Sequence, residues 1–274
     1  MRLGVVAGNV GVDCIRNVRE IPVAAEELGF DSVWFTDHVI GLKSYAPVYR
    51  GEWAEALTAL TWAAATTSRV RLGLGVLVLP MRDPVLVAKV LATADQLSGG
   101  RLVVGVGTGW AYREYEALGR GPLFERRGAA TDEALEVIRR CWEGGTFGWS
   151  GEWTSFKEIE FAPVPAQRPG PPIWVGGQSA PALRRAARFG DAWHPYGLTP
   201  QQVRDMGDEL DEKAGRKVQR TMRLNYRMPE KAEALASVEA FVAAGCTDIV
   251  VEPKVETTDE LRAELDELAR NFLG

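Results

Sequence analysis

Short runs rich in Val, Leu, Ile and Trp alternate with longer segments of helical periodicity along the whole chain. This alternation is typical of a parallel sheet whose strands are joined by helices. The runs that predict strands are residues 2–7, 31–36, 70–78, 101–106, 172–176, 191–194, 221–227 and 247–251. Strands of this kind, each followed by a helix, form either a closed barrel or a doubly wound open sheet.

Two features favour the closed barrel. The βα units repeat without the long excursion that separates the two halves of a nucleotide-binding sheet. The length of 274 residues is also close to that of a barrel with few insertions, about 250 residues. We therefore predict an α/β fold of the (β/α)8 barrel type, with residues 1–274 forming a single domain.

The predicted helices have apolar faces that we expect to pack on the barrel. These faces consist of Leu57, Leu60, Ala63 and Ala64 in one helix, and of Leu86, Val90, Ala94 and Leu97 in the next. Several helix ends are marked as well. In the helix that contains Leu86, Asp83 precedes a proline at the start and Gly99 follows the end. Both are common capping signals. Capping boxes begin at Thr199 and Thr257.

Three irregular stretches rich in Gly, Pro and aromatic residues follow predicted strands: residues 37–54, 107–127 and 143–171. The third contains a predicted hairpin over residues 147–161. In a barrel the loops after the strands meet at one mouth, and barrel enzymes build their active sites there. We therefore expect the chemistry of this protein at the C-terminal ends of its strands.

Composition narrows the choice of partners and compartment. The net charge is −5, from 37 acidic and 32 basic side chains, and no basic stripe suggests a nucleic-acid partner. Cys14, Cys141 and Cys246 are too widely spaced for a disulfide framework or a thiolate zinc site. No segment approaches the roughly 18 apolar residues of a membrane span, and the N-terminal apolar run is too short for a signal peptide. We expect a cytoplasmic protein without a membrane partner.

The sequence contains two histidines, His38 and His194, and each stands at the C-terminal end of a predicted strand. Asp37 directly precedes His38, so a carboxylate adjoins a group that titrates near neutral pH. This combination suits proton transfer to or from a bound ligand. A strand-end Asp that caps a turn, next to a hydrogen-bonded loop histidine, would give the same local sequence, and position alone does not decide between the two.

Glycines mark three further places. Residues 105–109 read GVGTG, where a flat ring or a phosphate could approach the backbone, although the spacing lacks the third glycine of a dinucleotide-binding turn. Residues 176–179 read GGQS, and Ser179 is a candidate N-cap. This turn suits an anion, while an ordinary tight βα turn explains its glycines equally well. Gly73 and Gly75 lie inside the third predicted strand, where glycine indicates a bulge or a close ligand.

Four segments together resemble the luciferase-like family, and specifically its branch that uses the deazaflavin coenzyme F420. They read ELGFDSVWFTDHV, SRVRLGLGVLVLPMRDP, DQLSGGRLVVGVGTGW and PPIWVGGQSAPALRRAARFGDAWHP, and they cover residues 27–39, 68–84, 95–110 and 171–195. Each segment by itself is a loose match to the family, but four matches in this order are specific for it. Because family members are (β/α)8 barrels, the resemblance implies the closed barrel.

The resemblance also implies roles for individual residues. In similar enzymes the Asp-His pair lies beside the deazaflavin, which makes Asp37 a cofactor contact and His38 the proton donor or acceptor. The family's third strand bulges behind the ring with a non-prolyl cis peptide, and Gly75–Val76 is the matching bond. The remaining positions that match cofactor contacts are Thr108 and Gly109 after the fourth strand, and Gly176 and Gly177, with Gln178 beside them, in the phosphate loop.

One position departs from the pattern of the similar sugar-phosphate dehydrogenases. An acidic residue follows their Thr-Gly of strand four, but here that residue is Trp110. Since this carboxylate is missing, we expect an apolar or aromatic substrate rather than a sugar phosphate. The candidate substrate contacts are Trp110, Tyr49 and His194.

The resemblance implies hydride transfer between coenzyme F420 and a small organic substrate, with His38 handling the proton. Flavin mononucleotide (FMN) is the alternative cofactor, in a monooxygenase of the same family that uses reduced flavin and oxygen. A protein that binds the cofactor without turnover is another alternative. A metal-dependent hydrolase is disfavoured, because two histidines supply few ligands and we predict no metal site. A homodimer is implied by resemblance alone.

Overall fold

The computed structural model describes residues 1–41, 51–226 and 231–273, and it contains a closed parallel barrel. The barrel strands are β1 (Arg2–Val6), β2 (Ser32–Phe35), β3 (Arg71–Leu74), β4 (Leu77–Val78), β5 (Leu102–Gly107), β8 (Ile173–Gly176), β9 (Ala192–His194), β10 (Gln219–Tyr226) and β11 (Cys246–Pro253). Pairing of β3 with β5 closes the ring. The prediction of a (β/α)8 barrel is therefore confirmed.

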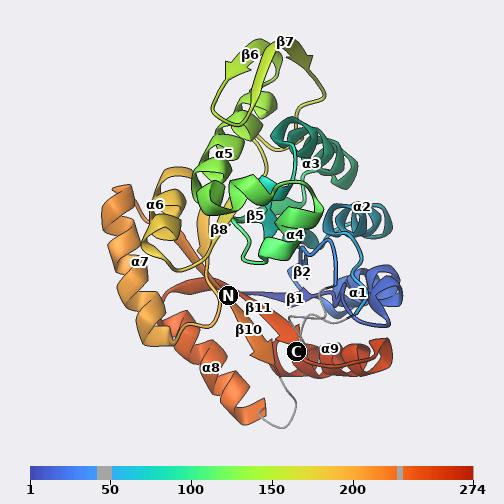
Figure 1. Cartoon of the computed structure of the whole chain (residues 1–274). Coiled ribbons are helices and arrows are strands. Elements are labelled where there is room, and N and C mark those ends of the chain that lie inside the picture. Colours follow the sequence, from blue (N-terminus) through green and yellow to red (C-terminus); the bar gives the residue numbers. More distant parts are fainter. Residues whose placement is uncertain (42–50, 227–230, 274) are drawn as a thin grey trace.

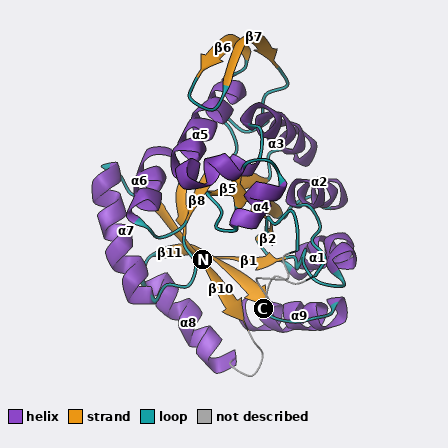
Figure 2. Cartoon of the chain, viewed as in Figure 1, coloured by secondary structure: helices purple, strands orange, loops and turns teal. Residues whose placement is uncertain are grey.

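Helices surround the barrel, as Figures 1 and 2 show. They are α1 (Cys14–Leu28), α2 (Ala56–Thr66), α3 (Pro84–Ser98), α4 (Tyr112–Ala117), α5 (Arg127–Glu143), α6 (Ala180–Phe189), α7 (Pro200–Ala214), α8 (Lys231–Ala243) and α9 (Thr258–Phe272), with the short 3₁₀ helices η2 (Leu79–Met81) and η3 (Gly121–Arg126). The predicted hairpin is also present, as β6 (Gly145–Ser150) and β7 (Ser155–Phe161), and it projects away from the barrel (Figure 1). Among the helices described, none is long and apolar enough to cross a membrane.

The predicted helix ends are confirmed. The Asp83 side chain accepts a hydrogen bond from the Leu86 amide at the start of α3, and Gly99 ends that helix with a φ of 70°. Thr199 and Thr257 each form a complete capping box at the starts of α7 and α9. Such caps satisfy amide groups that have no partner inside the helix, so local sequence is enough to locate them.

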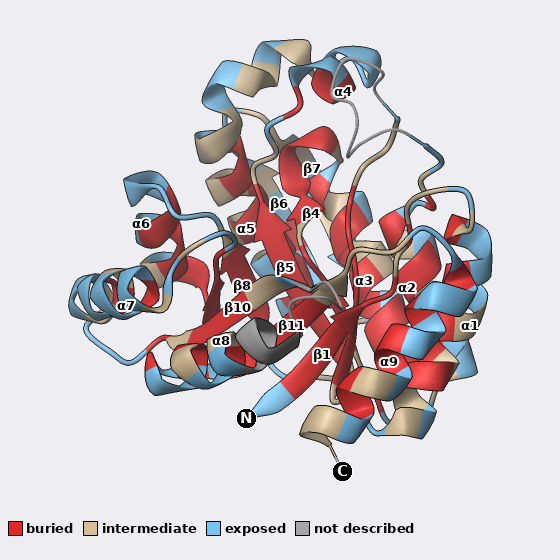
Figure 3. Cartoon of the chain, turned by 90° about the horizontal axis from the view of Figure 1, so that it is seen from below, coloured by how far each residue is buried: buried red, intermediate tan, exposed pale blue. Residues whose placement is uncertain are grey.

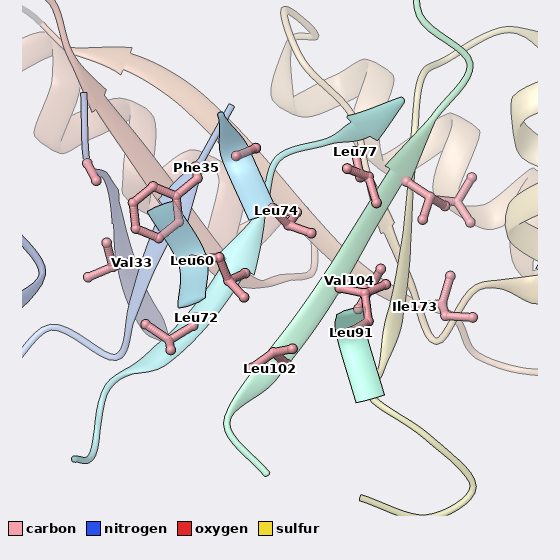
Figure 4. Close-up of a cluster of buried hydrophobic side chains, with 14 of the residues drawn as sticks. Val33, Phe35, Leu60, Leu72, Leu74, Leu77, Leu91, Leu102, Val104 and Ile173 are labelled. Atoms are coloured by element: carbon pink, nitrogen blue, oxygen red, sulfur yellow. The ribbon is translucent and has the colours of Figure 1, made fainter. Parts of the chain in front are cut away.

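Most of the core lies between the barrel and its helices. Figure 3 shows the strands buried, while the outward faces of the helices are exposed. On neighbouring strands, Phe35 and Leu74 point outward towards this layer, where Leu60 of α2 and Leu91 of α3 also lie (Figure 4). The outward side chains thus belong to one apolar cluster that holds the helices on the sheet.

The face predicted for α3 was wrong in part. Leu86 and Leu97 are 63% and 66% exposed, whereas Val87 and Leu91 are among the residues of α3 that face the core. Val, Leu and Ala occupy so many positions of this helix that spacings of three and four can be drawn on more than one face. Packing against α2, α5 and β5 selects the face that is buried.

The inside of the barrel is filled by a separate cluster, which contains Val6, Trp34, Val103, Trp174, Ala192 and Val250. The rings of Trp34 and Trp174 lie 4.7 Å apart between centroids. Trp34 on β2 pairs in register with Gly73 on β3, and a Cβ atom at Gly73 would come within 2.3 Å of the indole ring. Glycine is thus required at position 73 by a tryptophan of the protein itself.

Gly73→Ala is expected to lower the free energy of unfolding by about 1–3 kcal/mol, because the added methyl group overpacks the barrel interior against Trp34. Thermal unfolding should show a melting temperature several degrees below that of the wild type. Gly121→Ala is the matched control, since a Cβ there would lie 3.6 Å from the Tyr112 hydroxyl, at an ordinary contact distance. Equal melting temperatures for the two variants would contradict this account of Gly73.

Candidate active site

The predicted third strand, residues 70–78, is divided into β3 and β4 by a bulge at Gly75 and Val76. The peptide bond between these residues is cis, as the resemblance implied. The Val76 side chain turns towards β5 and β8, and Cβ atoms at Gly107 and Gly176 would lie 2.5 and 2.9 Å from its methyl groups. At Gly107 and Gly176, therefore, the missing side chains make room for Val76.

Asp37 is held at the bulge by a buried ion pair. Both carboxylate oxygens accept hydrogen bonds of 2.7 Å from the Arg82 guanidinium, and the Val78 amide donates to Oδ2 at 2.8 Å. The Asp37 side chain is fully buried. Arg82 also contacts Glu55, which caps α2. The Asp37 carboxylate thus joins the end of β2 to the strand segment after the bulge.

Asp37 and Arg82 each change the pKa of the other. Burial raises the pKa of the Asp37 carboxyl above its ordinary value, although the charge and hydrogen bonds of Arg82 and the Val78 amide act in the opposite direction. Burial lowers the pKa of Arg82, but Asp37 and Glu55 outweigh this effect and raise it overall. Without the guanidinium, the Asp37 carboxylate would be left buried and incompletely paired.

His38 follows Asp37 and forms a hydrogen bond with a second carboxylate. Its Nδ1 atom lies 2.9 Å from Oε2 of Glu114, on α4. The other oxygen of Glu114 accepts hydrogen bonds from the amides of Val39 (2.7 Å) and Ile40 (3.4 Å). Burial raises the pKa of Glu114, but the hydrogen bonds from His38 and from these amides outweigh it and hold the pKa below its ordinary value. Glu114 is therefore ionised at neutral pH.

Aromatic rings border the His38 imidazole. The Trp53 ring lies 4.5 Å from it between centroids, and the Trp110 ring meets it edge-on at 5.9 Å. Trp110 is about half exposed. Two predicted site residues, His38 and Trp110, are therefore neighbours. Tyr49, the third aromatic candidate, lies outside the described residues.

Thr108 and Gly109 follow β5 and are fixed by their neighbours. The Tyr115 hydroxyl donates to the Thr108 carbonyl, and Arg127 donates to the Gly109 carbonyl at 3.1 Å. Gly109 has a φ of 68°, and a Cβ there would lie 2.6 Å from a methyl group of Val78. The turn after β5 therefore packs on β4, next to the segment that Asp37 holds.

His194 lies deeper, at the end of β9 inside the barrel. Its ring stacks on Trp34 at 5.2 Å, and its Nδ1 atom lies 2.6 Å from the Thr221 hydroxyl. Burial lowers the pKa of His194 to about 3, so the ring is neutral at physiological pH. Its Nε2 atom lies 3.7 Å from the position of a Cβ at Gly75 and has no hydrogen-bond partner among the described residues.

The turn after β8 leads into α6. Gly177 has a φ of 95°, which favours glycine, and its carbonyl accepts a hydrogen bond of 2.7 Å from the Trp193 indole. The Ser179 side chain accepts from the Ala182 amide and so confirms the predicted N-cap. Gln178 is exposed between them. Gly177 thus lies in a left-handed conformation directly before the N-terminus of α6, where free backbone N–H groups could hold an anion.

The structure thus gathers most of the candidate residues around the bulge. Three of their partners were not predicted from the sequence: Arg82, Glu114 and Arg223. The Arg223 guanidinium donates to the Gly75 carbonyl at 2.7 Å and pairs with Glu252. Arg82 lies within a segment that carried the resemblance, but Glu114 has no local signal, because it stands on a short helix among other charged residues. Position 110 offers no carboxylate, yet Glu114 brings one to His38 from four residues further along.

The closed parallel barrel carries an imidazole–carboxylate pair and glycine-rich turns at its mouth, which is where barrel enzymes build their active sites. The chain belongs to the luciferase-like monooxygenase family, whose model matches residues 1–271. This result confirms the resemblance.

Two relatives extend over most of the chain. An F420-dependent glucose-6-phosphate dehydrogenase from Amycolatopsis mediterranei is 29% identical over 92% of this chain and 77% of its own length. A putative coenzyme F420-dependent oxidoreductase from Mycobacterium tuberculosis is 28% identical over 89% of this chain and 72% of its own length. An FMNH2-dependent dimethylsulfone monooxygenase from Pseudomonas putida is 33% identical, but over 48% of this chain and 37% of its own length. The relatives support an oxidoreductase.

Solved structures support the fold. A monooxygenase from Streptomyces bottropensis superposes with a TM-score of 0.86 at 22% identity, covering 100% of this chain and 99% of its own. An F420-dependent secondary alcohol dehydrogenase superposes with a TM-score of 0.84 at 20% identity, covering 98% and 97%.

Arg82→Met is expected to lower the free energy of unfolding by about 3–5 kcal/mol, because it leaves the Asp37 carboxylate buried without its cation. Urea unfolding at neutral pH measures the loss, and the double variant Asp37→Asn with Arg82→Met should recover part of it. Arg16→Met is the control, since Arg16 pairs with Glu20 and Asp259 at the surface and should have little effect on the urea midpoint. Equal midpoints for Arg82→Met and Arg16→Met would refute a structural role for the buried pair.

Proposed function

We propose that this protein transfers a hydride between coenzyme F420 and a small apolar or aromatic organic substrate, with His38 as the proton donor or acceptor. The observation that carries the proposal is the His38–Glu114 pair beside the bulged third strand, in a chain related over most of its length to F420-dependent enzymes. When bound, the deazaflavin supplies the hydride chemistry.

The residues at the mouth fit a cofactor with a flat polar ring and a phosphate. Gly177 and the N-terminus of α6 would hold the phosphate, with Gly176 and Gln178 in the same turn. The Gly75–Val76 bulge, with Thr108 and Gly109 beside it, would support one face of the ring. The His194 Nε2 atom is a buried acceptor without a partner in the described part of the chain, which suits a ligand N–H group.

Asp37 would contribute in a different way from the direct contact that the resemblance implies. Its carboxylate oxygens already accept hydrogen bonds from Arg82 and Val78. We therefore assign Asp37 to holding the bulge on which the cofactor would rest. A backbone shift there would also move His38, the next residue in the chain.

His38 would hold or receive the proton that accompanies hydride transfer. Its Nδ1 atom is occupied by Glu114, so the proton would pass through Nε2. Trp110 beside the imidazole would supply an apolar wall for the substrate and help to exclude water. His194 would contact a ligand only as a hydrogen-bond acceptor, because it remains neutral.

The second candidate function is an FMN-dependent monooxygenase, favoured by the FMNH2-dependent relative from Pseudomonas putida. The same turn at α6 and the same bulge would serve either cofactor, since both carry a flat tricyclic ring and a phosphate. Binding rather than fold therefore separates the two candidates.

Titration of the purified protein with F420 and with FMN should give tight binding of F420 and weak binding of FMN. Quenching of tryptophan fluorescence measures occupancy, because Trp110 and Trp53 lie at the proposed site. The reverse order of affinities would favour the monooxygenase, and failure of both ligands to bind would reject the cofactor assignment.

His38→Ala is expected to reduce turnover by about 10²- to 10⁴-fold while leaving the affinity for the cofactor nearly unchanged, because the imidazole acts on a proton rather than on binding. Steady-state kinetics and the same fluorescence titration check the two parts separately. Wild-type turnover in the variant would end the proposed role of His38.

A further inference from the structure

We propose that Glu114 is a positioning residue that fixes the tautomer of His38, with the proton on Nδ1, and so makes Nε2 the atom that exchanges a proton with the ligand. The functional part of this inference rests on the proposed function, while the tautomer itself does not. Glu114 is not among the site residues predicted from the sequence.

Glu114 is held in its ionised form by its surroundings. Its side chain is nearly fully buried, and the amides of Val39 and Ile40 both point at Oε1. Backbone N–H groups can only donate, so they stabilise the carboxylate and leave no room for a proton on this oxygen. The hydrogen bond to His38 uses the second oxygen, Oε2.

The Glu114 carboxylate fixes the tautomer of the His38 ring. A carboxylate can only accept hydrogen bonds, so the 2.9 Å contact requires that Nδ1 of His38 carries a hydrogen. In the neutral ring the other nitrogen, Nε2, must then hold the lone pair. The carboxylate also fixes the orientation of the ring between Trp53 and Trp110, because the bond is directional.

Replacing Glu114 with glutamine is expected to invert the tautomer of His38 with little other change. In Glu114→Gln, the two backbone amides need an acceptor at Oε1, and they would face a donor if the side-chain amide were flipped. The carboxamide NH₂ is therefore directed at His38 Nδ1, which must then accept. The hydrogen moves to Nε2, while the bonds to Val39 and Ile40 are kept.

His194 provides an internal reference. Its Nδ1 atom contacts the Thr221 hydroxyl, which itself donates to the Trp193 carbonyl at 3.1 Å. The Thr221 oxygen must therefore accept from Nδ1–H of His194, so this ring has the same tautomer without any carboxylate partner. Glu114 lies outside this chain of hydrogen bonds, and its substitution should leave His194 unchanged.

The experiment is nitrogen NMR of the full-length protein labelled with ¹⁵N-histidine, at a pH about two units above the ordinary histidine pKa of 6.5. Two histidines give two sets of ring signals, which His38→Asn assigns. In the wild type we expect the Nδ1–H tautomer for both rings. In Glu114→Gln we expect the Nε2–H tautomer for His38 and no change for His194.

The matched control is Glu116→Gln, the same chemical change on the exposed side of α4, where Glu116 pairs with Arg113. It should leave both rings and the turnover at wild-type values. Turnover of Glu114→Gln should fall by about 10²-fold or more, since a misplaced proton removes general acid–base catalysis. Cofactor affinity should stay close to that of the control.

An Nε2–H tautomer of His38 in the wild type would overturn the inference, and this measurement does not require that any variant folds. An unchanged tautomer in folded Glu114→Gln would also overturn it. Inversion of the tautomer with normal turnover would show that the proton does not pass through Nε2. If F420 and FMN both fail to bind while the tautomer inverts as expected, the proposed function fails and the structural role of Glu114 stands.

Discussion

Arg82 reaches back from the end of η2 to the Asp37 carboxylate at the end of β2, across 45 positions of sequence. The same carboxylate takes the amide of Val78, so it fixes where the chain runs after the bulge in the third strand. The loop segment after β5 packs against Val78. His38 directly follows Asp37 in the chain. The arrangement of the mouth therefore follows from one buried ion pair, whose charges are costly to bury unless both are present.

The two carboxylates near His38 have different roles. Asp37 is adjacent in sequence, but its oxygens are committed to Arg82 and Val78, so it holds backbone. Glu114 is distant in sequence, and its carboxylate meets the imidazole. The hydrogen-bond partner of His38 is therefore Glu114 and not Asp37, its neighbour in the sequence. Adjacent side chains can point in different directions at the end of a strand. The chemistry of the site depends on which carboxylate is placed to accept a hydrogen bond from the imidazole.

The glycines around the barrel interior serve packing in several places where a ligand was the obvious explanation. Gly73 accommodates Trp34, and Gly107 and Gly176 accommodate Val76. A tightly packed interior leaves no space for an additional Cβ at these points, since cores approach crystalline density. Gly177 differs, because its positive φ belongs to the turn that begins α6. A glycine in a strand therefore indicates that another group lies close to the backbone. It does not indicate whether that group is a side chain or a ligand.

Local sequence determined the strands, the hairpin and the capped ends of α3, α7 and α9, because periodicity and capping depend on residues a few positions apart. The resemblance of four segments identified the family and the cis bond at Gly75. Tertiary structure alone decided which face of α3 is buried and that Arg82 and Glu114 are the partners of Asp37 and His38. These pairs are 45 and 76 positions apart. Their side chains meet only when the barrel closes and brings the loops after β2, β4 and β5 to one mouth.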